Sequence, residues 1–335
     1  MKTTSKKRSF YIYCFLLVLF LIGFTYAFGN TRKKNQQPIT DTRFALNTVI
    51  TITLYDTDNT QILNHAFELC EQYEKVFSRT APDSELYKLN HSSQNTIQVS
   101  NDLASLIQTG LYYSRLSKGA FDISIAPVSQ LWDFTSETPV IPDNTSIKEQ
   151  LPYIGYWNFS LDGSTLTRKQ VHNQLDLGAI AKGFIADKIK EYLQCKGVQS
   201  AIINLGGNIL CVGDKNGQPF NIGIQAPFKE RNVTLTNLKI KDKSIVTSGI
   251  YERCFTKNDK LYHHLLNPET GYPYENELSS VTIISNKSVD GDALSTTCFA
   301  MGLEKGLAYI NSQKDLEAIF VDSKGSLHYS KGLKK

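Results

Sequence analysis

The chain has 335 residues, of which 41% are hydrophobic and 20% are charged, so it can bury the core of one large domain or two modest ones. That composition excludes a largely disordered protein. The formal net charge is +4, but seven basic and no acidic residues fall within residues 1–40, which leaves −3 for the remainder. The positive charge therefore belongs to the amino-terminal segment and predicts no nucleic-acid-binding surface.

The amino terminus has the pattern of an export or anchor segment. Residues 1–9 are basic, and residues 10–28 form an uncharged apolar run of 19 positions, close to the roughly 20 that span a bilayer as a helix. Residues 25–27 (TYA) match a cleavage site only weakly, which favours an uncleaved signal anchor and leaves cleavage of a signal peptide open. With the basic flank in the cytoplasm, residues 29–41 form a linker, and residues 42–335 form an extracytoplasmic domain held at the cell membrane.

The pattern of apolar residues predicts helices and strands in an irregular order. Alternating β-branched residues predict a strand over residues 42–56. Helical spacing predicts helices over 62–78 and near 101–116, the second with Ser100 or Asn101 as its N-cap. The remaining expectations are a turn-rich region at 133–175, helices at 181–193 and 292–310, strands at 200–205, 208–213, 220–227, 235–240, 244–255 and 281–285, and a closing hairpin of 318–322 and 327–330. Hairpin-like joins favour an α+β fold with antiparallel sheet over a doubly wound parallel fold.

The stretch LDLGAIAKGFIAD, residues 175–187, mixes two acids, one lysine and two glycines with apolar residues. Glycines before a helix let backbone N–H groups converge on an anion, and Lys182 in the first turn would reach a phosphate. The stretch matches neither the GxxxxGK[ST] phosphate loop nor the GxGxxG fingerprint. An ordinary strand-to-helix turn with a solvated lysine explains it equally well.

A second stretch, VDGDALSTTCFAMG, places polar side chains on one helix face. Asp292 and Thr296 are four residues apart, and Ser295 is beside them. A carboxylate and hydroxyls in the first helical turn suit a hard cation such as Mg²⁺. Capping of the helix by Asp292 is the commoner role and stays open.

Three further stretches are unusual without being decisive. NLGGN, residues 204–208, has paired glycines that allow a bulge or the close approach of another group. HHLLNPETGYP, residues 263–273, places two histidines before a turn, and one of them could act as a base near a phosphate. GAFDISIAPVSQLW, residues 119–132, offers Phe121 and Trp132 as partners for an aromatic ring. Taken singly, each stretch is more simply a structural turn or part of the core.

The order of these motifs carries more information than any one of them. GAFD…P…LW, DLGAIAKGFIAD, NLGGN, TSGIYER, HxLNPxTGxP and DALST follow one another along the chain. In this order they resemble the FAD:protein FMN transferases, the ApbE family, from about residue 40 to the end. The resemblance implies a T-fold-like α+β architecture with antiparallel sheets flanked by helices. It also implies that the protein binds FAD and Mg²⁺, cuts the FAD pyrophosphate, attaches FMN to a Ser or Thr of an acceptor protein and releases AMP.

The resemblance assigns roles by motif position. FAD contacts are implied for Leu46, Thr80, Ala120, Phe121, Asp122, Asp176, Lys182 and Leu266. Metal ligands are implied for Ala179, through its carbonyl, and for Asp292, Ser295 and Thr296. The incoming hydroxyl is a weak nucleophile, and His264 is the candidate base. One departure is Asn47, which stands where the family often has a glycine and bears on the contact made by Leu46.

The acceptor implied by an extracytoplasmic location is a membrane redox protein with a flavin-bearing Ser or Thr. Two other functions stay open at this point. With water as the acceptor, the same site would be an FAD pyrophosphatase that yields FMN and AMP. Without catalysis, the chain would be an extracytoplasmic flavin-binding module, although a metal at the pyrophosphate is unnecessary for storage. AMP formation with and without acceptor distinguishes the three.

Overall fold

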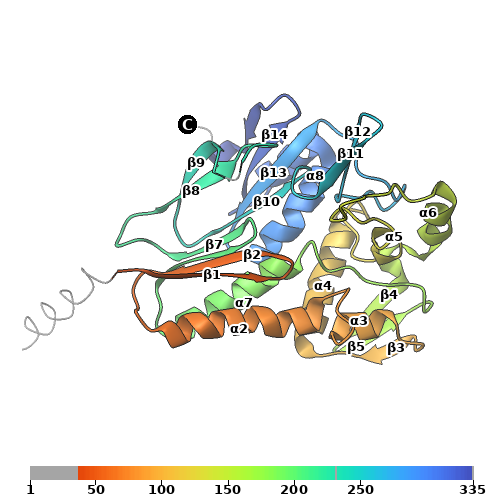
Figure 1. Ribbon diagram of the computed structural model, residues 1–335, viewed down its shortest axis with the longest axis horizontal. Coiled ribbons are helices and arrows are strands. Elements are labelled where there is room, and N and C mark those ends of the chain that lie inside the picture. Colours follow the sequence, from red (N-terminus) through yellow and green to blue (C-terminus); the bar gives the residue numbers. More distant parts are fainter. Residues whose placement is uncertain (1–36, 231, 334–335) are drawn as a thin grey trace, which may run out of the picture.

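The computed structural model describes residues 37–230 and 232–333, so the predicted anchor and most of the predicted linker lie outside the described residues. Within these two ranges, no helix is both long and apolar enough to cross a membrane. The described chain forms one large antiparallel sheet with helices packed against it (Figure 1). An α+β fold with antiparallel sheets, as predicted, is therefore confirmed.

The large sheet has eight strands in the order β1-β2-β6-β7-β10-β13-β14-β15. Every neighbouring pair in it is antiparallel. Its strands are β1 (Ile39–Ala45), β2 (Thr48–Leu54), β6 (Ser200–Leu205), β7 (Asn208–Gly213), β10 (Ser244–Gly249), β13 (Leu278–Ser285), β14 (Glu317–Asp322) and β15 (Leu327–Tyr329). Strand β13 is buried along its whole length, because both faces of the sheet are covered there.

The helices of the described chain are α2 (Thr60–Phe77), α3 (Glu85–Asn90), α4 (Asn101–Leu116), α5 (Ala126–Ser129), α6 (Asn144–Gln150), α7 (Ala181–Cys195) and α8 (Ser288–Ser312), with 3₁₀ turns at Leu151–Tyr153, Tyr156–Asn158 and Lys331–Leu333. Helices α2, α7 and α8 pack against one face of this sheet, and the other helices of the described chain lie beyond them. The predicted helices at 62–78, 101–116 and 181–193 are confirmed as α2, α4 and α7. Ser100 is the N-cap of α4, and its Oγ accepts the Leu103 N–H at 3.3 Å. The main core lies between these helices and the sheet.

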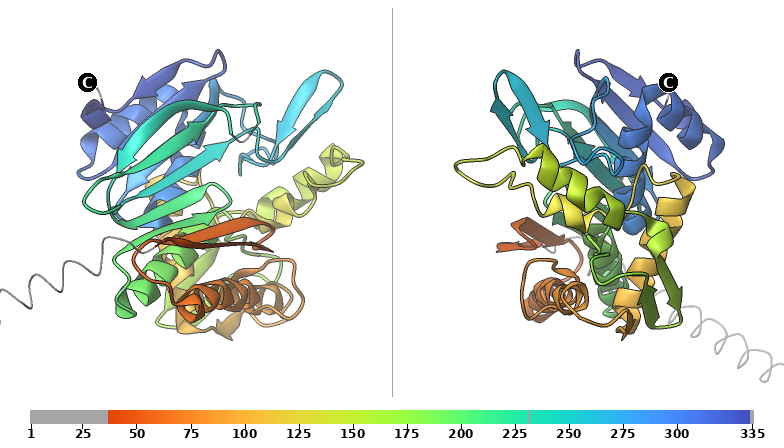
Figure 2. Two further views of the ribbon diagram at one scale, coloured as in Figure 1. Left: turned by 60° about the vertical axis from the view of Figure 1, so that its left-hand side comes forward. Right: turned by 90° about the vertical axis from the view of Figure 1, so that its right-hand side faces the viewer.

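The opposite face of the sheet carries a hairpin of β8 (Phe220–Gln225) and β9 (Thr234–Ile240), which encloses a second apolar cluster. Three short strands, β3 (Thr96–Gln98), β4 (Phe159–Asp162) and β5 (Thr165–Arg168), pair separately. A further hairpin, β11 (Cys254–Lys257) and β12 (Lys260–His263), projects from the body on the same side as α6 (Figure 2). The hairpin packs against the segment between α5 and α6 through aromatic rings, which are those of Trp132, Phe134, Phe255 and Tyr262.

Three sequence predictions of element bounds were wrong. The strand expected over 42–56 is the β1–β2 hairpin, because Leu46 and Asn47 turn the chain with φ of 52° and 56°. The strand expected over 244–255 ends at Gly249 and resumes at Cys254. The helix expected from residue 292 begins at Ser288 and is interrupted at Gly302, where φ is 76°. Asparagine tolerates the left-handed region, so Asn47 keeps a backbone that a glycine would also allow.

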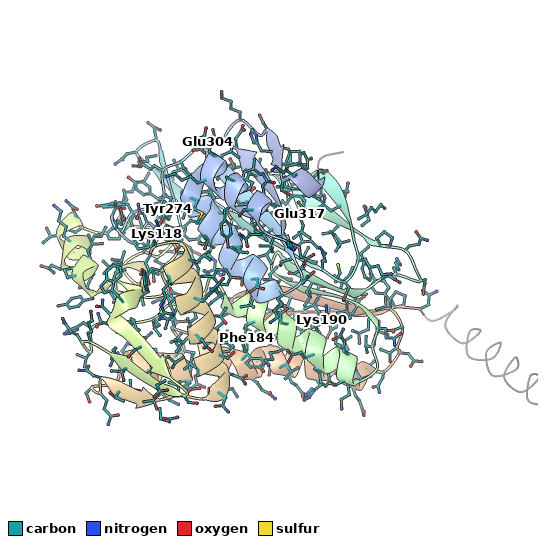
Figure 3. All side chains as sticks on the ribbon, turned by 180° about the vertical axis from the view of Figure 1, so that it is seen from behind. Lys118, Phe184, Lys190, Tyr274, Glu304 and Glu317 are labelled. Carbon is teal, nitrogen blue, oxygen red and sulfur yellow. The ribbon has the colours of Figure 1, made fainter. Side chains whose placement is uncertain are left out.

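Helices α7 and α8 pack directly against each other at their amino-terminal ends, as seen from behind the molecule in Figure 3. A Cβ on Gly183 would lie 2.4 Å from the Ser288 carbonyl oxygen and 2.6 Å from the Val289 Cα. Backbone atoms cannot move aside as a flexible side chain would. Only glycine therefore permits this approach, which brings two predicted site motifs together.

Candidate active site

The start of α7 lacks the usual arrangement of backbone hydrogen bonds. Its N-cap residue, Ile180, has no capping side chain, and the Gly183 N–H donates to Asp292 Oδ2 at 2.8 Å. The first N–H groups of any helix lack an intrahelical acceptor, so this carboxylate satisfies an N–H that the helix itself cannot. Within the described part of the chain, the Ala179 carbonyl in the preceding loop accepts no hydrogen bond. That carbonyl oxygen is therefore available to a ligand.

Asp292 is almost completely enclosed, with 5% of its surface exposed. Burial raises the pKa of its carboxyl, and the positive charge of Lys182, the Gly183 N–H and the Asn208 side chain oppose that rise. Nearby, Asn208 Nδ2 is buried and has no partner in residues 37–230 and 232–333. Buried polar atoms are almost always satisfied in a native protein, so these groups together indicate a bound ligand.

Hydroxyl groups complete the oxygen donors at this point. Ser248 Oγ, on β10, lies 2.7 Å from Ser295 Oγ and 3.1 Å from Thr296 Oγ1. Ser295 Oγ also donates to the Asp292 backbone carbonyl at 2.9 Å. The sequence predicts Asp292 in the first turn of α8, but α8 begins four residues earlier, at Ser288. Asp292 instead caps α7, by accepting the Gly183 N–H. The capping alternative is therefore correct for a different helix and does not compete with metal binding by the second carboxylate oxygen.

This donor set fits Mg²⁺ better than a softer metal. It consists of one carboxylate, one carbonyl and hydroxyls, and the described residues contain no group of three or more His, Cys, Asp or Glu side chains that could hold a metal. Mg²⁺ is commonly held by one or two carboxylates together with substrate phosphates. A metal at Asp292 would therefore depend on oxygen atoms of the substrate for part of its coordination.

His264 presents a neutral imidazole beside this site. Its Nδ1 is buried with no hydrogen-bond partner among the described residues, and its backbone N–H donates to the Arg253 carbonyl at 3.1 Å. Burial lowers the pKa of the imidazole to about 3, assisted by the charges of Arg253, His263 and Lys182. The ring is therefore unprotonated at neutral pH and can accept a proton.

Two cations near His264 lack partners of their own. Neither the Lys182 amino group nor the Arg253 guanidinium forms a hydrogen bond or an ion pair within the described ranges. Unpaired cations that flank a neutral base favour an anion between them. Arg253 and Ser248 both belong to the TSGIYER motif, and no local pattern distinguishes either residue within it.

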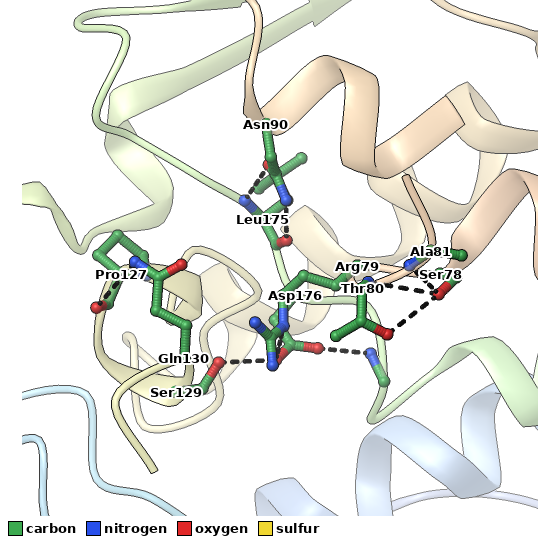
Figure 4. Close-up of polar contacts among 11 residues, drawn as sticks. Ser78, Arg79, Thr80, Ala81, Asn90, Pro127, Ser129, Gln130, Leu175 and Asp176 are labelled. Atoms are coloured by element: carbon green, nitrogen blue, oxygen red, sulfur yellow. Dashed lines mark hydrogen bonds and ion pairs between the residues drawn. The ribbon is translucent and has the colours of Figure 1, made fainter. Parts of the chain in front are cut away.

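Asp176 is held by a separate set of contacts (Figure 4). Its Oδ2 accepts from Arg79 Nε at 3.1 Å and from Ser129 Oγ at 2.8 Å, and its Oδ1 accepts the Gly178 N–H at 3.0 Å. Thr80 follows Arg79 and donates its N–H to Ser78 Oγ at 3.3 Å. Two predicted contact residues, Asp176 and Thr80, therefore meet at the loop before α7, although the ion pair with Arg79 was not predicted.

The predicted contact residues of the GAFD motif are engaged within the fold. Asp122 accepts three hydrogen bonds, from the N–H and Oγ of Ser124 and from the Tyr156 N–H, at 2.7–2.8 Å. The Ala120 carbonyl accepts from the Tyr274 hydroxyl at 2.7 Å. Phe121 is 4% exposed and packs in the main core. Within this segment, the Asp122 N–H donates to no acceptor among the described residues. A ligand that contacts the segment would therefore accept a hydrogen bond from the main chain.

Leu46 and Leu266 lie in different surroundings. Leu46 is in the β1–β2 turn. The neighbouring Thr48 packs closely on Gly206, because a Cβ added to Gly206 would lie 2.2 Å from Thr48 Oγ1. This turn therefore adjoins the NLGGN motif. The Leu266 side chain is 7% exposed and packs with Trp132 in a smaller apolar cluster. The structure thus places the turn that holds Leu46 beside Gly206, whereas it keeps the Leu266 side chain inside that cluster.

Comparison with known proteins identifies the family. The profile of the ApbE family matches residues 46–320. The chain belongs to the ApbE family. It is 37% identical over 275 residues to the FAD:protein FMN transferase of Klebsiella pneumoniae (strain 342), a match that covers 81% of this chain and 85% of the relative. It is 34% identical to the FAD:protein FMN transferase of Treponema pallidum (strain Nichols), over 77% of this chain and 76% of that protein.

Solved structures agree with the sequence matches. The crystal structure of the ApbE protein of Thermotoga maritima superposes with a TM-score of 0.81 at 29% identity and covers 88% of this chain and 98% of its own. The flavinyl transferase ApbE of Pseudomonas stutzeri, in its apo form, gives a TM-score of 0.77 at 25% identity, over 88% and 95% of the two chains. Family profile, curated relatives and solved structures together place this chain among the FAD:protein FMN transferases.

Proposed function

We propose that this transferase requires Mg²⁺ and attaches FMN to a Ser or Thr hydroxyl of an acceptor protein, with release of AMP. The proposal is carried by the free Ala179 carbonyl and the Asp292 carboxylate beside the hydroxyls of Ser248, Ser295 and Thr296. These hard oxygen donors lie next to an unpaired lysine and a neutral histidine, which suits a pyrophosphate substrate.

In this proposal, Ala179, Asp292, Ser295 and Thr296 hold the metal. Bound Mg²⁺ would neutralise charge on the pyrophosphate and polarise the reacting phosphorus. Lys182 contacts a phosphate from the first turn of α7, and its own N–H has no partner in the part of the chain that the structure describes. Asp176, Thr80 and Leu46, together with the Ala120–Asp122 backbone and Leu266, contact the remainder of FAD.

The transfer step moves one bond at phosphorus. The acceptor hydroxyl oxygen forms a bond to the FMN phosphorus, the bond from that phosphorus to the bridging oxygen breaks, and AMP leaves with the bridging oxygen. The hydroxyl proton passes to the imidazole of His264, which is neutral before the reaction. A bound pyrophosphate beside the ring would raise its low pKa toward the range that a general base needs. Lys182 and Arg253 balance the negative charge that develops on the departing phosphate.

The acceptor assay tests this function directly. The enzyme is incubated with FAD and Mg²⁺, with or without an extracytoplasmic redox subunit that carries a candidate Ser or Thr. The expected result is AMP only when the acceptor is present, together with an acceptor mass increased by one FMN. AMP formed at the same rate without acceptor would identify a pyrophosphatase, and no AMP in either reaction would contradict catalysis by this site.

The proposed location is the outer face of the cell membrane, with a T-fold-like catalytic domain over residues 42–335 and an anchor over residues 10–28. It rests on the basic residues that precede the apolar run. Protease added to intact cells should digest the catalytic domain while a cytoplasmic control protein survives. Full protection of the domain until the cells are lysed would contradict this topology.

Replacement of Lys182 by alanine should weaken FAD binding by about tenfold or more. A charge-assisted hydrogen bond contributes roughly 1.5–3 kcal/mol, and about 1.4 kcal/mol corresponds to a tenfold change in affinity. The melting temperature of the apo protein should stay nearly unchanged, because the amino group has no partner within the described ranges. Calorimetric titration of FAD measures the effect, with Lys188→Ala on the same helix as the control. Equal dissociation constants would mean that Lys182 only faces solvent.

A further inference from the structure

The second acid of the stretch at 175–187, Asp187, has no part in the proposed chemistry, yet it is firmly bound. Its Oδ1 accepts the Ser288 N–H at 2.8 Å, and its Oδ2 accepts the Val289 N–H at 2.9 Å. These are the first two N–H groups of α8, whose N-cap residue Lys287 has no capping side chain. Asp187 of α7 thus caps α8 from outside that helix.

Asp292 of α8 caps α7 in the same way, through the Gly183 N–H at 2.8 Å. The two helices therefore exchange caps, and each supplies the carboxylate that the other lacks. The exchange requires close contact, which Gly183 permits because it has no Cβ to meet the Ser288 carbonyl. This pair of contacts fixes how far α8 can slide or rotate relative to α7.

The first turn of α8 also orients a polar side chain of the site. Ser288 Oγ accepts from Ser244 Oγ at 2.9 Å and donates to Asn208 Oδ1 at 2.7 Å. Ser288 Oγ thereby fixes the orientation of the Asn208 amide and leaves its nitrogen without a partner in the described residues. The Asn208 side chain also helps to lower the pKa of Asp292. The position of Ser288 therefore bears on the environment of the proposed metal ligand.

We propose that Asp187 is a positioning residue for the metal site, because its hydrogen bonds to the Ser288 and Val289 N–H groups set the register of α8 that presents Asp292 to the first turn of α7. This inference rests on the proposed Mg²⁺ site. Asparagine and serine cap helices as well as aspartate does, but neither accepts two N–H groups with a pair of equivalent oxygens. Asp187 is a carboxylate in a position where burial raises its pKa to about 6. Its presence there is consistent with a requirement for both hydrogen bonds.

The test measures metal affinity in the Asp187→Asn variant. An amide retains the shape of the carboxylate but offers one oxygen and turns an NH₂ group toward the other N–H. Mn²⁺ is titrated into protein saturated with FAD, without acceptor, and free Mn²⁺ is followed by electron paramagnetic resonance. Because groups that orient metal ligands typically contribute 10–100-fold to metal affinity, binding should weaken by about that factor. FAD affinity without metal should change less than about twofold.

The matched control is Glu191→Gln, which makes the same charge change on the same helix. Glu191 is exposed and pairs only with Lys188, at 3.1 Å, so Mn²⁺ affinity should equal that of the parent. If Asp187→Asn fails to fold, Asp187→Ser decides the question, because a serine hydroxyl still caps a helix but accepts only one of the two N–H groups. About tenfold weaker Mn²⁺ binding is expected there.

Unchanged Mn²⁺ affinity in the folded Asp187→Asn variant, or in Asp187→Ser when that variant decides, would overturn the positioning role. A loss of melting temperature without a change in metal affinity would likewise show that Asp187 serves stability alone. If the parent protein itself binds no Mn²⁺, the proposed metal dependence fails and this inference fails with it. The two failures are therefore distinguishable.

Discussion

Replacement of Asp292 by asparagine is expected to reduce Mg²⁺-dependent FMN transfer by at least about a thousandfold, because a metal ion supplies several kcal/mol of charge stabilisation at a reacting phosphorus. The asparagine oxygen can still accept the Gly183 N–H, so the cap on α7 persists. Alanine would be a poorer test. It would leave that N–H buried and unpaired at a cost of about 1–3 kcal/mol, and lost activity could then reflect lost structure.

The stability of the Asp292→Asn variant should be equal to or higher than that of the parent at neutral pH. Burial raises the pKa of Asp292 in the folded state, so the folded protein binds this proton more tightly than the unfolded chain does. The ionised carboxylate therefore opposes folding once the pH exceeds its unfolded pKa, and an amide removes that penalty. Thermal unfolding at pH 7 measures whether the melting temperature of the variant is above or below that of the parent.

Asp290→Asn is the matched control for this experiment. Asp290 lies two residues earlier and accepts from the Tyr113 hydroxyl at 2.8 Å, away from the proposed ligands. It should retain near-parent transfer activity. If Asp292→Asn keeps parent activity at low Mg²⁺ concentration, Asp292 is a helix cap and nothing more.

Replacement of His264 by asparagine should lower the rate of FMN transfer by about 10²–10⁴-fold, the usual contribution of a general base. FAD affinity should change less than about threefold, because the proposed role of the ring concerns the acceptor proton. Single-turnover transfer and FAD titration separate the two effects. His263→Gln is the control, since His263 Nε2 contacts the Tyr274 carbonyl at 3.1 Å and has no proposed chemical role. Full activity of the His264 variant would exclude it as the base.

The same variant should change the dependence of stability on pH. The pKa of His264 is lowered to about 3 in the folded protein, chiefly by burial, from a model-peptide value near 6.5. Between these two values the unfolded chain binds more protons, so this group makes the folded state more stable as pH rises. The slope of the unfolding free energy against pH is proportional to the number of protons taken up on unfolding. Without His264, this number should fall by up to one between about pH 4 and pH 6.5. Urea unfolding at several pH values measures this slope, and identical slopes would contradict the buried, neutral ring.

The sequence predicts the helices that cover the sheet better than it predicts the site. Apolar periodicity and a capping serine predict α4 to the residue, because those signals are local. The exchange of caps between α7 and α8 gives no such signal, since Asp292 and Gly183 are 109 positions apart. The resemblance implies roles for Asp292 and Ala179, but no local pattern indicates that the Asp292 carboxylate accepts the Gly183 N–H of another helix.

The turns were predicted less well for a related reason. The alternation over residues 42–56 continues through Leu46 and Asn47, and neither residue is the glycine that usually marks a tight hairpin. Ser248 and Arg253 were missed although their motif was noticed. Their importance comes from neighbours on β13, α8 and the segment after β12, which are remote in sequence.

The exchanged caps also bear on how the protein folds. Three hydrogen bonds join positions 101, 102 and 109 residues apart, so none of them forms until a long loop has closed. The amino-terminal ends of α7 and α8 should therefore become ordered together, as one cooperative unit that opens only with the surrounding core. Consequently the proposed metal ligands would not be assembled in partly folded chains, and flavin transfer would begin only after the whole domain has closed around this pair of helices.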